Sequence, residues 1–438
     1  MLKSKNKVVL DSIIIGAALF SMFFGAGNMI FPPYLGLKAG TDWFSGFLGY
    51  YIADIGLAVV AILAQIRVGG HERFLSPLGK FVGPVMMFAV VMCIGPIISI
   101  PRTAATTYEL SIAPIFEGFN TPLFYIIFFS AVALLCINQS AVVDIIGKIL
   151  TPLLFLGLIF LIVMGLINPM GNITLPPRTE NVIADGISAG YQSMDVLASV
   201  IFGVIILSSA ADKGHTEEKA KSRVAAGAGI VAGIGLLIIY LGLTYLGATA
   251  SSGYDMHIDR TSLLTSIIST LMPGTWGLVF FAVVAGLACL STAIALTTSA
   301  AEYLEGLTKG KIKYKYFVIG ICIFDAIISL AGVEMLISFA APILEVVYPP
   351  ILMLVLTSFL PKRLGELPKM ISAFCAMLFA VLTVISSYGV EIPLLRELPL
   401  SSLGLGWLLP SVAVLLLGIA GDLLFNTKTK LSKHEYNS

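Results

Sequence analysis

Twelve apolar segments, each long enough to cross a membrane, constrain the fold of this chain more than any other feature. They lie at residues 11–37, 43–66, 81–107, 121–138, 143–168, 187–210, 223–248, 274–303, 315–331, 333–360, 369–389 and 402–425. Only 12% of the 438 residues are charged, against about a quarter in a soluble chain. We therefore expect an all-α polytopic membrane protein with about 12 transmembrane helices in a lipid bilayer.

The basic residues support this register of segments. With the N-terminus inside, 21 of the 26 lysines and arginines fall in inner loops and tails, and four fall in outer loops. Because positively charged loops stay in the cytoplasm, both termini are expected to be cytoplasmic. Lys3, Lys5 and Lys7 before an apolar run imitate a signal peptide, but the many further segments and the lack of a cleavage site favour a retained first helix.

The first apolar segment contains a stretch of helix breakers, Gly25 to Pro33 (G-A-G-N-M-I-F-P-P). Gly25 and Gly27 are poor helix formers, and Asn28 can bond to nearby backbone. The two prolines lack an amide hydrogen, although a proline suits the first turn of a new helix. Counting from about Leu10, the stretch begins roughly 22 Å along the segment, near mid-membrane. Since irregular backbone persists there only beside protein or a water-lined cavity, we expect two half-helices that meet at a binding site.

Four further stretches carry polar or helix-breaking residues where a lipid-facing helix would not. They are Gly95–Ala104 (G-P-I-I-S-I-P-R-T-A), Gly190–Asp195 (G-Y-Q-S-M-D), Gly286–Ala293 (G-L-A-C-L-S-T-A) and Pro342–Pro350 (P-I-L-E-V-V-Y-P-P). Charged residues inside a membrane are costly and usually face the interior of the protein. These stretches are therefore the other candidates for a functional site.

The cysteines and histidines give no sign of a metal centre or of catalysis. The five cysteines are scattered through apolar segments without C-x-x-C spacing, which is typical of small buried side chains. All four histidines lie in loops or tails, and the H-E-x-x-H and G-x-S-x-G signatures are absent. We expect no enzyme and no cofactor. No nucleic-acid partner is expected either, because the basic residues form only short clusters between apolar segments.

Taken together, these stretches resemble the branched-chain amino acid:cation symporters, the bacterial branched-chain amino acid system II carriers. The resemblance rests on F-F-G-A-G-N-M-I-F-P-P, G-P-I-I-S-I-P-R-T-A, G-Y-Q-S-M-D-V-L-A and A-C-L-S-T-A-I-A-L-T, in this order. It implies the LeuT-type architecture of amino acid transporters, with helices 1 and 6 broken, in a bacterial cell (inner) membrane. Two inverted five-helix repeats at 11–168 and 187–360 would precede two peripheral helices and a cytoplasmic tail at 361–438, all within one transporter domain.

The resemblance implies import of leucine, isoleucine or valine, and the residues at the joints suit a zwitterion. The amides of Ala26, Gly27 and Asn28 are expected to hold the carboxylate without a buried cation. The glycines at 25 and 27 permit close approach, and carbonyls of the sixth segment are expected to take the ammonium group. The candidate substrate-binding residues are Gly25, Ala26, Gly27, Asn28, Ile97, Ile98, Tyr191, Gln192, Ser193, Met194 and Ile294. The apolar wall among them is Ile97, Ile98, Met194 and Ile294.

By the same resemblance, the coupling ion is sodium. Its ligands would be the carbonyls of Ser21, Phe24 and Ala288 and the hydroxyls of Ser291 and Thr292. A neutral, all-oxygen cage of this kind suits a hard monovalent cation. The alternative is a proton-coupled transporter of other small neutral amino acids, which needs a titratable group inside the membrane. The candidates for that group are Asp54, Asp195, Asp325 and Glu345, although Glu345 can equally be a structural partner of a neighbouring helix.

Several side chains keep a structural interpretation beside the functional one. Ser291 and Thr292 can bond back to their own helix, and Asp195 can cap the second half of a broken helix. Arg102 can reach the outer interface, or it can form a gate or an ion pair with Glu109. An ion channel is the alternative of a different class, but a channel would need a repeated filter in a symmetric oligomer.

Overall fold

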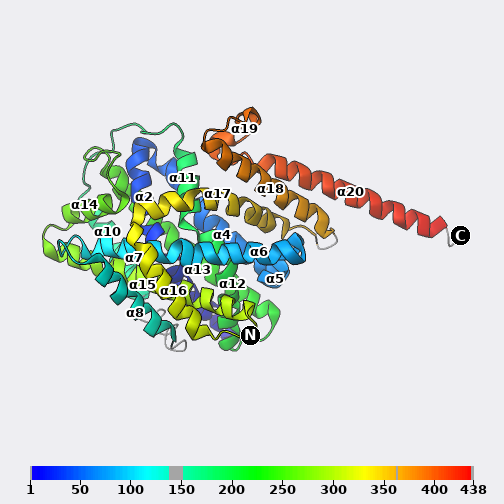
Figure 1. Ribbon diagram of the computed structural model, residues 1–438, viewed down its shortest axis with the longest axis horizontal. Helices are drawn as coiled ribbons and strands as arrows, with labels where there is room; N and C mark the ends of the chain where they lie inside the picture. Colours follow the sequence, from blue (N-terminus) through cyan, green and yellow to red (C-terminus); the bar gives the residue numbers. More distant parts are fainter. Residues whose placement is uncertain (1, 138–150, 362–363, 436–438) are drawn as a thin grey trace. The chain divides into compact units, whose positions relative to one another are not determined.

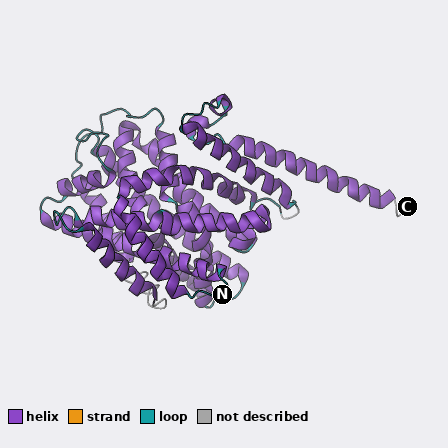
Figure 2. Ribbon diagram, viewed as in Figure 1, coloured by secondary structure: helices purple, strands orange, loops and turns teal. Residues whose placement is uncertain are grey.

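The computed structural model describes residues 2–137, 151–361 and 364–435. Within these ranges the chain is helical and forms no strand (Figure 2), so the predicted all-α fold is confirmed. Residues 143–150 of the predicted fifth segment lie outside the described residues, and so do Lys148, Lys362 and Arg363 of the charge count.

Most of the helices are labelled in Figure 1, and the labels follow chain order. Up to residue 167 they are α1 (Leu2–Phe23), α2 (Ala26–Ala39), α3 (Trp43–Tyr51), α4 (Leu57–Val68), α5 (His71–Leu75), α6 (Gly79–Met92), α7 (Ser99–Thr107), α8 (Thr121–Ile137) and α10 (Thr151–Ile167). They continue with α11 (Val182–Ser193), α12 (Asp195–Asp212), α13 (Glu218–Thr249), α14 (Arg260–Leu271), α15 (Thr275–Leu307), α16 (Tyr314–Ile328), α17 (Val333–Thr357), α18 (Glu366–Ser387), α19 (Pro393–Glu397) and α20 (Leu408–Glu435). Shorter π-helical turns follow α3, α6 and α7 at Ile52–Gly56, Cys93–Ile97 and Tyr108–Ile112.

The long helices have the length and surface of membrane spans. Among the described residues, nine helices are long and apolar enough to cross a membrane, and three shorter apolar helices join them. Each of the twelve predicted segments contains one of these helices or part of one. Large apolar side chains point outward from them, for example Ile126, Leu134 and Leu156. So much exposed apolar surface is stable in lipid rather than in water.

The chain packs as two compact units. The first is Met1–Ile62 with Val90–Ala341, and in it α13 lies against α1 and α2 while α11 lies against α3. Glycine permits the close approach of α2 and α13, because a Cβ at Gly247 would lie only 1.8 Å from the Pro33 carbonyl oxygen. The second unit is Leu63–Ala89 with Pro342–Ser438, where α18 packs along α20. The limits proposed for the five-helix repeats stay a prediction.

The first predicted segment is broken, as its glycines and Asn28 indicated. Helix α1 ends at Phe23 and α2 begins at Ala26, with Gly25 in an extended conformation (φ −117°, ψ −160°) as the N-cap of α2. The amides in the first turn of a helix have no acceptor within that helix. Pro32 and Pro33 lie inside α2 rather than in its first turn, because the break falls at Gly25, well before the prolines.

The sixth predicted segment is broken too, between α11 and α12. Met194 between these helices has a left-handed backbone (φ 69°, ψ 13°), a conformation that a residue with a Cβ seldom adopts and that stops a helix. The segment starts earlier than expected, at Val182, because Asn181 caps α11 by accepting a hydrogen bond from the Ala184 amide at 3.1 Å. Both predicted joints are therefore present, and both lie in the first unit.

The third predicted segment also changes direction. Gly95 inside the π-helical turn Cys93–Ile97 is non-helical (φ −100°, ψ −126°), and Ile98 follows with φ −127° and ψ −61°. Helix α7 then starts afresh at Ser99. Residues 99, 102 and 103 share one face of a helix because they are three and four positions apart.

Candidate functional site

Both joints open onto one small cavity in the first unit. Its walls come from the start of α2, the face of α7 just described, the start of α12 and the middle of α15. The cavity has a volume of about 20 Å³, which is room for about one water molecule. Of the residues proposed from the sequence, the structure brings to its wall Gly25, Ala26, Gly27, Asn28, Ser193, Met194 and Thr292.

Asp195 connects the two joints. Its carboxylate accepts hydrogen bonds from the Asn28 side-chain amide at 2.9 Å and from the Tyr240 hydroxyl at 3.2 Å. Asn28 also donates to the Tyr240 hydroxyl oxygen. Asp195 is 3% exposed and lies in the first turn of α12, where the helix dipole favours an acid. Its side chain thus bonds across to α2 and α13, which supports the functional alternative for this residue over a local cap.

Arg102 is a buried cation at the first joint. It is 2% exposed, and its guanidinium donates to the Gln192 carbonyl oxygen at 2.7 Å. A Cβ at Gly27 would lie 3.0 Å from the guanidinium, which therefore touches the first turn of α2. Of the two alternatives for Arg102, reach to the outer interface is wrong, and the amides proposed to hold the carboxylate alone have this cation beside them. The prolines and the glycine around Arg102 indicated from the sequence that this residue belongs to a functional site. They could not predict the direction of its side chain.

The apolar wall differs from the one proposed. Ile98 and Ile294 are buried and Ile97 is half-buried, but none of them lines the cavity, and neither do Tyr191 and Gln192. The break at Gly95 redirects α7, so that Ser99, Arg102 and Thr103 face the cavity instead of the neighbouring isoleucines. The apolar lining consists of Met22, Phe23, Ile94, Ala198, Phe202 and Leu296 together with Met194.

The five residues proposed as sodium ligands come together beside the first joint. The Ser291 hydroxyl lies 3.3 Å from the Ser21 hydroxyl, 3.4 Å from the Ser21 carbonyl oxygen and 2.9 Å from the Ala288 carbonyl oxygen. The Thr292 hydroxyl lies 3.3 Å from the Phe24 carbonyl oxygen. Ser291 thus bonds both within α15 and across to α1, whereas Thr292 bonds across to α1. The convergence of neutral oxygens suits a monovalent cation, and the described residues hold no group of three or more His, Cys, Asp or Glu that could bind a metal ion.

A second hollow reaches the cavity from the side of the α1 N-terminus. It has a volume of about 400 Å³ and lies between α1, the C-terminal half of α12 and the end of α15. Met22 lines both this hollow and the central cavity. Met22 is therefore the lining residue that the site shares with a space large enough for an amino acid.

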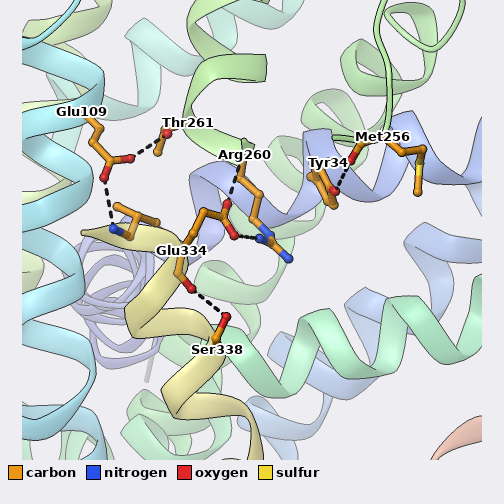
Figure 3. A network of polar contacts seen from close by, with 8 residues as sticks. Tyr34, Glu109, Met256, Arg260, Thr261, Glu334 and Ser338 are labelled. Carbon is orange, nitrogen blue, oxygen red and sulfur yellow. Dashed lines mark hydrogen bonds and ion pairs between the residues drawn. The ribbon is translucent and has the colours of Figure 1, made fainter. Parts of the chain in front are cut away.

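A network of polar contacts joins residues of α14 and α17 to neighbouring helices (Figure 3). Arg260 of α14 forms an ion pair with Glu334 of α17 and lies over the Tyr34 ring at 4.7 Å. Glu109 accepts hydrogen bonds from the Thr261 hydroxyl at 2.7 Å and from the Val333 amide at 3.1 Å. These contacts tie α2, α14 and α17 to the π-helical turn that follows α7.

Comparison with known proteins agrees with this geometry. Residues 8–424 match the family described as "Branched-chain amino acid transport protein". The chain is 33% identical to the branched-chain amino acid permease BraB of Bacillus subtilis (97% of this chain, 98% of that protein) and 32% identical to the permease BrnQ of Escherichia coli K12 (97% and 98%). These relatives are transport permeases and not enzymes.

Solved structures show the same fold at low sequence identity. Mhp1, a nucleobase-cation-symport-1 family transporter, superposes with a TM-score of 0.66 at 13% identity, covering 95% of this chain and 93% of that one. MhsT, solved in complex with L-phenylalanine, gives 0.55 at 19% identity, with 86% and 98% covered. Both are LeuT-type transporters, so the predicted architecture is confirmed. The protein is a multi-pass membrane protein that belongs to the family of branched-chain amino acid transport proteins.

Proposed function

We propose that this protein is a secondary active transporter that imports leucine, isoleucine or valine together with sodium by alternating access. The observation that carries the proposal is the meeting of two broken helices at one cavity. Helix α2 directs its first-turn amides to this cavity and α11 ends beside it. Broken helices at mid-membrane are where transporters of this architecture bind their substrates.

The cavity offers a partner for each part of a branched-chain amino acid. The carboxylate is held by the first-turn amides of α2 and by Arg102, which together supply donors and positive charge. The ammonium group is held by Asp195 and by the carbonyl oxygens at the end of α11. Ile94, Phe202 and Leu296 then receive the aliphatic side chain, because they line the apolar part of the cavity.

Sodium is favoured as the coupling ion by the oxygens between α1 and α15. The Ser291 hydroxyl lies 2.9 to 3.4 Å from oxygens of Ser21 and Ala288, and the adjacent Thr292 hydroxyl lies 3.3 Å from the Phe24 carbonyl oxygen. Because these ligands are neutral, a bound monovalent cation keeps its full charge, and its binding does not require the release of a proton.

Alternating access follows from the dimensions of the cavity and its surroundings. A space of about 20 Å³ is far too small for leucine, so the helices around the cavity must move when substrate enters. On one side the hollow that ends at Met22 provides a path. On the other side the contacts of Arg260 and Glu334 close the approach. We place the first of these sides in the cytoplasm of a bacterial cell, because the lysines and arginines gather in its loops.

Counterflow of labelled leucine into proteoliposomes tests this proposal, with sodium and pH gradients varied separately. We expect saturable counterflow that unlabelled isoleucine and valine inhibit and that an inward sodium gradient accelerates. Uptake that follows a pH gradient and ignores sodium would support the proton-coupled alternative. An ohmic current in the absence of leucine would indicate a channel.

A further inference from the structure

Asp54 is a fully buried carboxylate that neither the proposed substrate site nor the proposed sodium site uses. It lies in the π-helical turn Ile52–Gly56 and is 0% exposed. Its closest polar neighbours are the Tyr50 and Tyr240 hydroxyls and the Asp195 carboxyl, none of which is a cation. Such turns are rare and often occur at functional sites. Because an ionised carboxylate buried beside a second carboxyl is costly, this group requires a cation or a proton.

The turn that carries Asp54 lies directly against the joint between α11 and α12. Gly190 of α11 packs so closely that a Cβ there would lie 3.0 Å from the Tyr50 carbonyl oxygen and 3.1 Å from the Asp54 amide nitrogen. The Tyr50 hydroxyl lies 2.7 Å from the Ser193 hydroxyl, next to Met194. Any rotation of α11 at this joint therefore changes the surroundings of Asp54.

The charges around Asp54 leave one carboxylate to be neutralised. Helices α3, α11, α12 and α13 pack against the turn. The titratable groups that they bring near Asp54 are Tyr50 from α3, Asp195 from α12 and Tyr240 from α13. Asp195 lines the same cavity as Arg102, so the single positive charge of Arg102 balances Asp195. Tyrosine hydroxyls are neutral, and Asp54 is therefore the carboxylate without a balancing charge.

We propose that Asp54 is a proton-binding site whose occupancy is linked to movement at the α11–α12 joint. The proton comes from water and forms an O–H bond on one carboxylate oxygen, and it returns to water on release, so no electrons are transferred. With α11 packed on the turn, the carboxyl is protonated. When α11 moves and water reaches the turn, the group ionises. The link to leucine rests on the proposed alternating access, whereas protonation in the packed arrangement does not.

Infrared spectra of the purified full-length protein at neutral pH test the protonation directly. The wild type should show the carbonyl stretch of protonated carboxylic acids, and Asp54→Asn should remove one component of this band. Asp325→Asn is the matched control, because Asp325 is another 0% exposed carboxylate, on α16, which packs on α7, α8 and α15. The component that Asp54→Asn removes should remain in this control. Spectra of Asp54→Asn and wild type that are identical in this region would overturn the proposal.

A second variant covers the case in which Asp54→Asn does not fold, as judged by gel filtration. Asp54→Glu keeps the acid but changes its position, so it should shift this component rather than remove it. An unshifted component would show that another group produces the signal, and the proposal would fail.

The pH dependence of transport tests the link to the joint. At a fixed sodium concentration, leucine counterflow by the wild type should vary with pH. Asp54→Asn imitates the protonated form and should transport with most of this dependence lost, while Asp325→Asn should keep the wild-type profile. An Asp54→Asn profile that follows the wild type would refute the link. If the wild type shows no leucine counterflow at all, the proposed function fails, and the infrared band still decides whether Asp54 is protonated.

Discussion

At the scale of single residues, the central cavity depends on two opposite charges that face each other across the joints. Arg102 comes from α7 and Asp195 from the start of α12, and both line the cavity while almost fully buried. An isolated buried charge is costly, but a pair of opposite charges lowers that cost. A zwitterion brings one charge of each sign, so it can bind between them and leave the total charge of the site unchanged. The pair therefore suits a neutral amino acid better than an acid or a base.

Replacement of Thr292 by alanine should weaken sodium binding without removing the leucine site. The hydroxyl of Thr292 is one of five converging oxygens, and loss of one neutral ligand costs about 1 kcal/mol. The sodium concentration for half-maximal leucine uptake should therefore rise about fivefold. Thr244→Ala is the matched control, since this buried hydroxyl bonds to the Tyr240 carbonyl oxygen of its own helix at 2.7 Å. An unchanged sodium curve for Thr292→Ala would remove this residue from the ion site.

Replacement of Gly27 by leucine should abolish leucine binding while the protein still inserts into the membrane. A Cβ at this position would lie 3.0 Å from the Arg102 guanidinium and 3.2 Å from the Phe31 ring, so a larger side chain fills the cavity. Gly286→Leu is the control, because a Cβ at Gly286 of α15 meets nothing within 4 Å. Binding of labelled leucine to purified protein measures the effect. Wild-type binding by Gly27→Leu would place the substrate elsewhere.

At the scale of helices, the sequence predicts where a helix is broken better than it predicts which face of a helix lines the cavity. Gly25 and Asn28 indicate the first joint because both residue types disfavour a helix at any position within it. Met194 carries no such signal by itself, and the second joint could be located only within the polar stretch around it. The residues of this segment that line the cavity could not be predicted either, because Gly95 changes the direction of the helix. As a result, Ser99 and Thr103 line the cavity, whereas Ile97 and Ile98 do not.

The sodium ligands could be proposed only through the resemblance to a known family. Ser291 and Thr292 lie in an uninterrupted helix, α15, where two adjacent hydroxyls can equally bond to their own helix. The π-helical turn at Ile52–Gly56 could not be predicted at all. It shifts the register of the helix at a place where the sequence shows only apolar residues, one aspartate and one glycine. The setting of Asp54 is therefore visible only in the folded chain.

Packing of α2 on α13 gives a prediction at this scale. A Cβ at Gly247 would lie within the van der Waals radius of the Pro33 carbonyl oxygen, at 1.8 Å. Gly247→Ala must therefore separate the helices, and overpacking of this kind costs about 1–3 kcal/mol. We expect a lower midpoint of thermal unfolding in detergent. Gly320→Ala in α16 is the control, since nothing lies within 4 Å of a Cβ there. Equal midpoints for Gly247→Ala and wild type would show that the two helices can part without cost.

At the scale of the first unit, the two approaches to the central cavity are built differently. The hollow toward the α1 N-terminus is lined mainly by small and apolar side chains and ends at Met22. On the opposite side, the contacts that we propose to close the approach are directional: the ion pair of Arg260 with Glu334 and the hydrogen bonds of Glu109. Apolar contacts adapt to small shifts, whereas an ion pair is either made or broken. The balance between the two arrangements should therefore respond most sharply to changes at Arg260 and Glu334.

Glu334→Gln should open the approach that these contacts close. Because both side chains are partly exposed (22% and 39%), the ion pair contributes about 0.5–1 kcal/mol. Its loss should raise the open population about two- to fivefold. A cysteine at Thr103, which lines the cavity, reports this opening in a chain whose five native cysteines are replaced. Its labelling rate by a membrane-impermeant maleimide, added on the side opposite the N-terminus, should rise by the same factor.

The control for that measurement is Glu391→Gln, which removes the same charge from an ion pair with Arg396 in the second unit. That pair is exposed (76% and 79%), so its loss should leave the labelling rate unchanged. Labelling from the side of the N-terminus provides the converse readout. It should fall in Glu334→Gln, because a population that opens on one side closes on the other. If the rates rise on both sides, Glu334 stabilises the fold as a whole and does not select between the two arrangements.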